Sequence, residues 1–134
     1  MVPRIEYRKG ALRDLRDLRF EDGLSVSAES IEFNVLGMGH EFWLAVQSGA
    51  IIGVAVLSQE NHDSVKIIHL EVAPSRKKEG VGSSLLKAVM DARSQCDFSV
   101  IPAGETEAFY SHLGFVHAGR WEMRWSSLSK HKAP

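Results

Sequence analysis

Residues 69–86 read HLEVAPSRKKEGVGSSLL, and this stretch joins the end of a predicted strand to the start of a predicted helix. At the start of a helix, the first backbone N–H groups have no partner within the helix and carry a partial positive charge. Gly80 and Gly82 let the backbone approach an anion closely, and the basic run from Arg76 to Lys78 adds positive charge. The stretch therefore predicts a strand, a turn and a helix that together bind a phosphate group such as a pyrophosphate.

Two common glycine motifs do not account for this turn. A Walker A motif requires a lysine directly before the serine, but Gly82 directly precedes Ser83. The dinucleotide-binding motif GxGxxG requires a third glycine where this chain has Leu85. A pair of glycines can also simply ease a strand into a helix. Taken alone, the turn is therefore compatible with both a phosphate-binding and a purely structural interpretation.

The sequence around this unit predicts a mixture of strands and helices. Val81, Leu85 and Val89 repeat at helical spacing, which predicts an amphipathic helix. Two apolar runs flank Ser48-Gly49 and predict a β-hairpin. This order predicts an α/β fold with a mixed sheet covered by helices. The predicted strands are residues 4–8, 41–47, 50–58, 64–74, 97–101, 115–119 and 120–127, and the predicted helices are residues 11–23, 28–39, 81–94 and 104–115.

Length and composition limit the classes of protein to which the chain can belong. Its 134 residues fit one domain over residues 1–134, with 128–134 as a loose polar tail. A formal net charge of -1 provides no overall positive field, which argues against nucleic acid or an anionic membrane as a partner. A single cysteine, Cys96, and six histidines without metal-ligand spacing predict neither a disulfide nor a metal site. The first 30 residues contain no long apolar run, so we expect no signal peptide and a cytoplasmic location.

Two segments of the sequence resemble motifs of the GNAT family of N-acetyltransferases. KKEGVG, residues 77–82, resembles motif A, in which Arg or Gln is followed by two variable residues, Gly, one variable residue and then Gly or Ala. AFYSHLGF, residues 108–115, is similar to motif B, in which a tyrosine, here Tyr110, stands four residues before the closing Gly-Phe. The chain departs from these patterns in having Lys77 at the Arg/Gln position, and Ala103 where the family often has asparagine.

The resemblance is closest over residues 40–126, and it implies a GNAT-like fold with a mixed, mostly antiparallel sheet of six to seven strands and helices on both faces. It implies an acyltransferase that passes the acetyl group of acetyl-CoA, its cosubstrate, directly to a primary amine of a small molecule or peptide in a ternary complex. Backbone N–H groups hold the cosubstrate in this family, and a tyrosine near the sulfur serves as general acid. The implied cosubstrate-binding residues are Leu70, Val72, Lys77, Lys78, Glu79, Gly80, Val81, Gly82, Ser83 and Tyr110.

Several of these assignments keep an alternative. Tyr110 is either the implied general acid or a core aromatic residue. Ile68, Leu70 and Val72 are expected to share one face of the predicted strand. His69 and Glu71 project from the other face, which makes them candidates for the catalytic base, unless they only face solvent or pair with each other. The alternative to an enzyme is a CoA-binding or protein-interaction module on the same scaffold, and a homodimer is common in the family.

Overall fold

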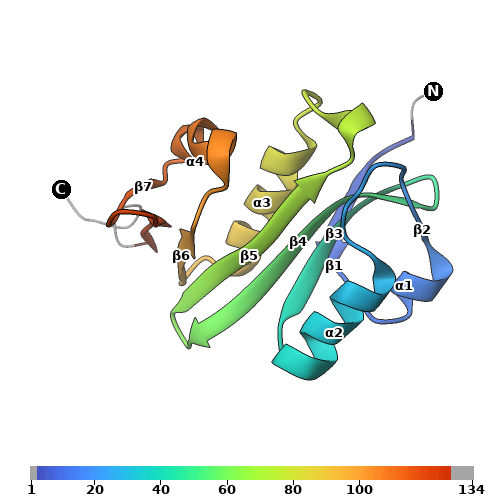
Figure 1. Cartoon of the computed structure of the whole chain (residues 1–134), viewed down its shortest axis with the longest axis horizontal. Helices are drawn as coiled ribbons and strands as arrows, with labels where there is room; N and C mark the ends of the chain where they lie inside the picture. The colour runs from blue at the N-terminus through green and yellow to red at the C-terminus, as the bar shows by residue number, and fades with distance from the viewer. Residues whose placement is uncertain (1–2, 128–134) are drawn as a thin grey trace.

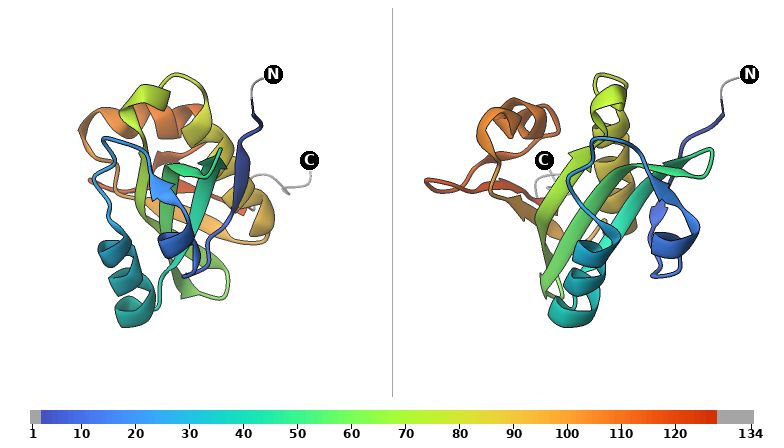
Figure 2. Two further views of the ribbon diagram at one scale, coloured as in Figure 1. Left: turned by 90° about the vertical axis from the view of Figure 1, so that its right-hand side faces the viewer. Right: turned by 45° about the vertical axis from the view of Figure 1, so that its right-hand side comes forward.

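The computed structural model describes residues 3–127, which form one eight-stranded mixed sheet with helices packed against it (Figures 1 and 2). Seven strands follow the order β1-β3-β4-β5-β6-β8-β7, and β2 pairs with β4 outside this line. The β5–β6 and β2–β4 pairs are parallel, whereas β1–β3, β3–β4, β4–β5, β6–β8 and β7–β8 are antiparallel. This mixed, mostly antiparallel sheet confirms the predicted fold class.

The bounds of the elements are as follows. The strands are β1 (Glu6–Lys9), β2 (Arg19–Phe20), β3 (Glu41–Gln47), β4 (Ala50–Asn61), β5 (Ser64–Val72), β6 (Asp97–Val100), β7 (Val116–His117) and β8 (Met123–Trp125). The helices are α1 (Asp14–Asp17), α2 (Ala28–Met38), α3 (Val81–Ala92) and α4 (Glu107–His112). Two single turns of 3-10 helix are η1 (Pro74–Arg76) and η2 (Gly104–Thr106).

The hairpin of β3 and β4 carries side chains into both layers of the core. Ser48 and Gly49 have φ angles of 51° and 76°, so both central residues of the two-residue loop are left-handed, as the predicted tight turn requires. Along β4, Val54 packs into the cluster that contains the buried side of α2, whereas Ala55 packs into the cluster that contains α3. Adjacent residues of a strand point to opposite faces, so α2 and α3 cover opposite faces of the sheet.

The two long helices form where the sequence predicts them. α2 begins after Ser27, whose hydroxyl accepts a hydrogen bond from the N–H of Ser30 at 3.1 Å, while the Ser30 hydroxyl accepts one from the N–H of Ser27 at 3.0 Å. In α3, Val81, Leu85 and Val89 are fully buried, at the spacing that places them on one side of the helix. Packing of this side against the sheet fixes the position of the helix start that the sequence predicts to bind an anion.

The segment 11–23, predicted as one helix, instead holds a single helical turn and a short strand. α1 ends at Asp17 because Leu18 is extended, with φ -112° and ψ 146°. The two residues of β2 then pair in parallel with the first two residues of β4. Leu15 still packs into the core beneath α2, so the apolar spacing is used while tertiary pairing overrides the local helical preference. This short strand is why the sheet has eight strands rather than the six to seven expected.

The last part of the described chain is less regular than the sequence predicts. The strand predicted over residues 120–127 is limited to β8, and the strand over 115–119 to the two residues of β7. The tail predicted over 128–134 lies outside the described residues. Across residues 3–127, no helix is long and apolar enough to cross a lipid bilayer.

Candidate active site

The edge of β5 is open along its second half. The parallel pairing of β5 with β6 ends at Ile67, whereas β5 continues to Val72. On its other side, β5 stays paired with β4, and the N–H of Ala73 donates to the carbonyl of Ile52 at 2.9 Å. Hydrogen-bonded and non-hydrogen-bonded residues alternate in an antiparallel ladder. The N–H groups of Leu70 and Val72 therefore point away from β4, toward the edge that β6 leaves open.

This open edge forms one wall of a cleft with a volume of about 560 Å³, and the start of α3 and the helix α4 form the other walls. All the residues predicted to bind the cosubstrate line this cleft, with the exception of Glu79. Of the three predicted catalytic residues, Glu71 and Tyr110 line it and His69 does not. The lining residues are Leu70, Glu71, Val72, Arg76, Lys77, Lys78, Gly80, Val81, Gly82, Ser83, Glu105, Thr106, Phe109 and Tyr110.

The start of α3 presents free backbone donors to the cleft. Gly80, with φ 78°, precedes the helix, and no side chain caps its N-terminus. The N–H of Ser84 donates to the carbonyl of Gly80 at 3.0 Å, which is the first bond of the helix. The N–H groups of Val81, Gly82 and Ser83 therefore have no acceptor within the helix. A row of free donors at the positive end of a helix fits the oxygens of a phosphate or pyrophosphate.

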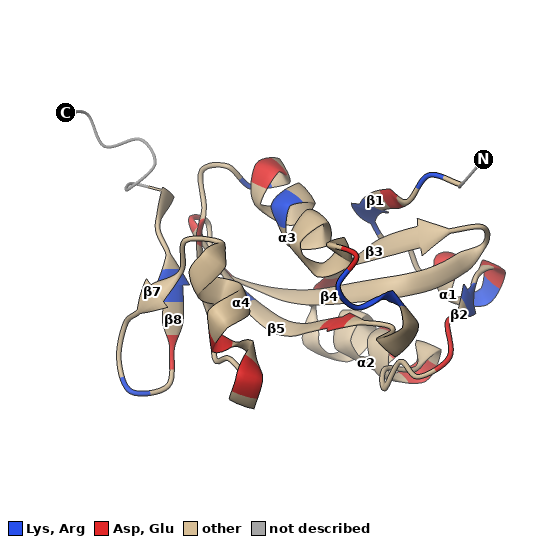
Figure 3. Cartoon of the chain, turned by 90° about the horizontal axis from the view of Figure 1, so that it is seen from above, with Lys and Arg blue, Asp and Glu red and all other residues tan. Residues whose placement is uncertain are grey.

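The basic turn between η1 and α3 adds positive charge beside these donors, as the blue stretch between β5 and α3 shows (Figure 3). Lys77 and Lys78 line the cleft. Arg76 also lines the cleft, but its guanidinium lies 3.3 Å from the carboxylate of Glu21 and 3.8 Å from that of Glu79. The charge of Arg76 is thus compensated within the protein.

Tyr110 places an aromatic ring and a hydroxyl in the wall that α4 contributes. The residue is 5% exposed, and its ring packs edge-to-face on Phe109 and Phe115, with ring centroids 5.1 and 5.3 Å away. Burial raises the pKa of Tyr110 to about 12, so the hydroxyl is protonated at neutral pH. Among residues 3–127, no group forms a hydrogen bond with this hydroxyl. Every fully buried side-chain oxygen in these residues does have a partner, so the hydroxyl is not fully buried, and Tyr110 lines the cleft. The hydroxyl is therefore accessible from the cleft.

Glu71 is held by hydrogen bonds on the α2 side of β5. Its carboxylate accepts from the N–H and the hydroxyl of Ser25, both at 2.9 Å, and lies 3.2 Å from Nε2 of His69. Partial burial alone would raise the pKa of Glu71, but the bonds from Ser25 and His69 outweigh it and hold the pKa below its usual value. Glu71 and His69 therefore pair with each other, which is one of the alternatives that the sequence left open.

The predicted faces of β5 need one correction. A register shift opposite Val56 and Leu57 makes Ile68 the extra residue of a bulge. Ile68 is 42% exposed, whereas Leu70 packs against the core beneath α3. The expectation that Ile68 and Leu70 share one face is therefore wrong, because it assumes a strand without a bulge.

Comparison with known proteins identifies the family. The sequence matches the acetyltransferase (GNAT) domain family over residues 20–124. The chain belongs to the GNAT family. The match covers most of the chain, including both segments on which the resemblance was based. No curated protein matches the sequence with significance.

Several solved structures have the same fold at low sequence identity. The Y145F mutant of KacT is 16% identical, covers 96% of this chain and 98% of its own, and has a TM-score of 0.76. The AtaT Y144F mutant toxin, solved with the C-terminus of the antitoxin AtaR and acetyl-CoA, is 15% identical over 93% of this chain and 94% of its own, with a TM-score of 0.75. The ribosomal-protein-S18-alanine N-acetyltransferase from Escherichia coli is 17% identical over 87% and 80%, with a TM-score of 0.68. These likenesses show the GNAT fold.

Some residues of this site have no local signal in the sequence. Ser25 reaches Glu71 across 46 positions of the chain, and no motif connects the two. Phe109, Glu105 and Thr106 line the cleft because α4 and η2 face β5, which only the fold determines. Within residues 3–127, no three His, Cys, Asp or Glu side chains are grouped as metal ligands.

Proposed function

We propose that this GNAT chain transfers the acetyl group of acetyl-CoA to a primary amine by direct attack in a ternary complex. One observation carries the proposal: the outward N–H groups of Leu70 and Val72, the free N–H groups at the start of α3 and the Tyr110 hydroxyl all line one cleft. The reaction forms an N–C bond, breaks the C–S bond of the thioester, and requires the amine to lose a proton and the sulfur to gain one.

The backbone donors bind and polarise the cosubstrate in this proposal. The N–H groups of Val81, Gly82 and Ser83, with Lys77 and Lys78 beside them, bind the pyrophosphate. The N–H of Leu70 pairs with the pantetheine arm, which extends along the open edge of β5. The N–H of Val72 donates to the thioester carbonyl oxygen, where negative charge develops as the amine attacks. These donors are fixed in place by the β4–β5 ladder and by α3, so they need no reorganisation during the reaction.

Tyr110 stabilises the leaving sulfur. Its pKa of about 12 lies well above that of an ordinary thiol, which is about 8.5. Complete proton transfer from Tyr110 to the thiolate is therefore uphill. The role that fits this order of pKa values is a hydrogen bond from the hydroxyl to the sulfur as the C–S bond breaks, with the proton on the free thiol supplied finally from solvent.

Water accepts the proton of the attacking amine. Glu71 already accepts two hydrogen bonds from Ser25 and one from His69, which leaves it little basicity. His69 does not line the cleft. We therefore assign Glu71 and His69 to positioning the segment that carries Ser25 rather than to proton abstraction.

Two measurements test the proposal. Calorimetry with acetyl-CoA and with CoA tests whether the cleft holds the cosubstrate, and thiol release in the presence of a panel of small-molecule and peptide amines tests transfer. We expect saturable binding and amine-dependent release of thiol. Binding without release for any amine would instead support the alternative of a CoA-binding module, and the absence of binding would contradict both.

A further inference from the structure

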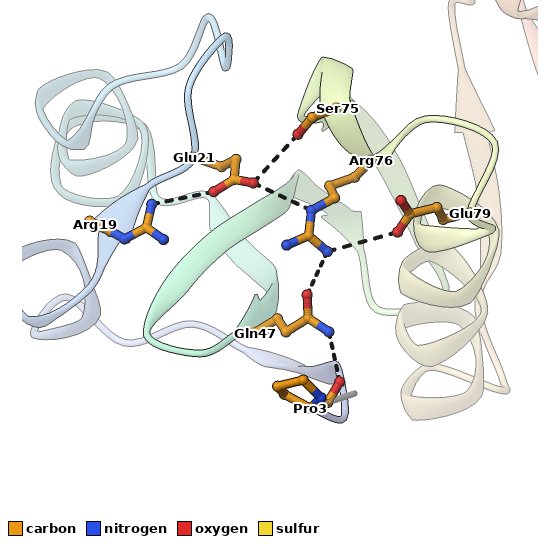
Figure 4. A network of polar contacts seen from close by, with 7 residues as sticks. All are labelled: Pro3, Arg19, Glu21, Gln47, Ser75, Arg76 and Glu79. Carbon is orange, nitrogen blue, oxygen red and sulfur yellow. Dashed lines mark hydrogen bonds and ion pairs between the residues drawn. The ribbon is translucent and has the colours of Figure 1, made fainter. Parts of the chain in front are cut away.

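A network of polar contacts joins the basic turn to the sheet (Figure 4). Arg76, the last residue of η1, is its centre. The Nε of Arg76 donates to Glu21 at 3.3 Å, and one terminal nitrogen donates to the side-chain oxygen of Gln47. The same terminal nitrogen lies 3.8 Å from the carboxylate of Glu79. Arg76 thus connects η1 to the residue after β2, to the end of β3 and to the turn before α3.

Gln47 is a buried connection within this network. It is 8% exposed, and both ends of its amide are used. Its oxygen accepts from Arg76, and its nitrogen donates to the backbone carbonyl of Pro3 at 2.7 Å. Gln47 does not line the cleft. A change at this position therefore reaches the cleft only through Arg76 or through the stability of the fold.

Glu21 anchors the network on the other side. Its N–H donates to the carbonyl of Ile51 in β4 at 2.9 Å, which fixes its backbone to the sheet. Its carboxylate accepts from Arg76 and, at 3.4 Å, from the hydroxyl of Ser75, and lies 3.3 Å from Arg19. Two consecutive residues of η1 are therefore bound to one carboxylate that the sheet holds in place.

We propose that Arg76 is a positioning residue, which ties the basic turn to the sheet through Gln47 and Glu21 and so aims the free N–H groups at the start of α3 into the cleft. Two carboxylates already compensate the charge of Arg76, so Lys77 and Lys78 supply the charge that meets an anion. The network is partly buried, and its buried member, Gln47, would be left without a partner if Arg76 moved away, which is costly. The ligand in this proposal rests on the proposed function; the positioning itself does not.

Substitutions at Gln47 separate positioning from direct contact with the ligand. Gln47→Leu removes the acceptor for Arg76, and we expect it to raise the Kd for CoA about tenfold, as we expect for Arg76→Ala. Gln47→Glu keeps an oxygen facing Arg76, and we expect affinity within about threefold of the unmodified chain. Arg19→Ala is the matched control, because it removes the same charge from the other side of Glu21, where the pair is exposed and weak. A Gln47→Leu chain that binds CoA like the unmodified chain overturns the proposal.

The salt dependence of the Kd for CoA gives a second test, because it would change in Arg76→Ala if Arg76 contacted the phosphate directly. Attraction between exposed charges weakens as salt rises from about 50 mM to about 300 mM. Lys77→Ala is expected to flatten the salt dependence of the Kd for CoA. Arg76→Ala is expected to lower affinity by the same factor at both salt concentrations. A flattened salt dependence in Arg76→Ala would mean that Arg76 meets the phosphate directly, and would overturn the positioning role.

Hydrogen exchange tests the positioning without any ligand. In the free protein, we expect the hydrogen-bonded amides of residues 76, 77 and 84 to exchange faster in Gln47→Leu and Arg76→Ala, and to recover most of their protection in Gln47→Glu. Amides in the middle of β4 should keep their protection in all variants, which shows that the fold is retained. If the unmodified chain fails to bind CoA but this pattern holds, the proposed function is wrong and the positioning stands. Unchanged exchange in Gln47→Leu and Arg76→Ala contradicts the positioning itself.

Discussion

Ser25 and Glu71 are joined by two hydrogen bonds, from the N–H and the hydroxyl of Ser25 to the two carboxylate oxygens, each at 2.9 Å. This pair fastens the segment before α2 to the strand that forms the cleft wall. Because the pKa of Glu71 is lower in the folded chain than in the unfolded one, folding favours the ionised carboxylate. Its contribution to stability is complete above the usual value of 4.5 and is lost as pH falls through the lower folded value.

Glu71→Gln tests this link. We expect the substitution to lower the free energy of unfolding by about 1 kcal/mol at neutral pH, because the bonds from Ser25 lose their charged acceptor. The difference from the unmodified chain should shrink as the pH falls below 4.5, because Glu71 then becomes protonated first in the unfolded chain and, at lower pH, in the folded one. Urea unfolding at several pH values measures it. Glu32→Gln, on the exposed side of α2, is the control and should show no such dependence; an equal difference at every pH would contradict the link.

Tyr110→Phe tests the role of the hydroxyl. The ring contacts with Phe109 and Phe115 remain, so we expect stability and the Kd for acetyl-CoA to change little. We expect kcat for a proven amine to fall by about a hundredfold, at the lower end of the range for removing one hydrogen-bond donor that stabilises developing charge. Steady-state kinetics and calorimetry on the same sample separate the two effects. An unchanged kcat would remove Tyr110 from the reaction.

The raised pKa of Tyr110 also predicts a pH profile. With a pKa of about 12, the hydroxyl keeps its proton throughout the alkaline range in which the protein can be assayed. We therefore expect no loss of kcat from ionisation of a tyrosine up to about pH 10, the ordinary tyrosine value. A fall in kcat centred near that value in the unmodified chain, absent from Tyr110→Phe, would show that burial does not shift the group.

Lys78 has a left-handed backbone, with φ 71°, which is unfavourable for a residue with a side chain. Lys78→Gly should raise the free energy of unfolding by about 1 kcal/mol, since glycine adopts this conformation freely. Lys77→Gly is the matched control, because it removes the same charge from a neighbour whose φ is -67°. We expect it to destabilise by about 0.5 kcal/mol through the greater freedom of the unfolded chain. Thermal unfolding compares the two, and equal shifts would contradict the role of backbone strain.

Gly23 lies against the ring of Pro74, where a Cβ would come within 2.7 Å of the proline Cδ. Gly23→Ala should therefore destabilise the chain by about 2 kcal/mol through overpacking, in addition to the cost of its φ of 91°. Gly39→Ala, with φ 72° and open space around it, isolates the backbone cost alone. Chemical denaturation of both variants gives the difference. Equal losses would mean that the chain shifts around Pro74 without cost.

The parts of the fold that could be predicted from sequence are those that local patterns determine. The β3–β4 hairpin follows from its two-residue turn, and α3 follows from its apolar spacing and from Gly80 at its start. The position of the cleft could be predicted because much of its lining lies close together in the sequence, at Lys77, Lys78 and residues 80–83. Turn residues and apolar spacing of this kind specify the same element in any fold that buries the same face of it.

The parts that could not be predicted depend on contacts between distant segments. β2 forms because β4 offers it an edge, which overrides a helical pattern around Leu18. Gln47 and Arg76 are 29 positions apart, and nothing in either segment indicates that they meet. The basic run predicts where the turn lies, but only the fold determines that Arg76, and not its neighbours, is paired with Glu21 and Glu79.

The hydrogen-bond donors at the open edge of β5 are backbone N–H groups and not side chains. Replacing Leu70 or Val72 with almost any other amino acid would leave the same hydrogen in the same place. Proline is the exception, because it has no such hydrogen to give. Alanine scanning would therefore not detect the role of these donors, and the role can be retained while the side chains at these positions change during evolution.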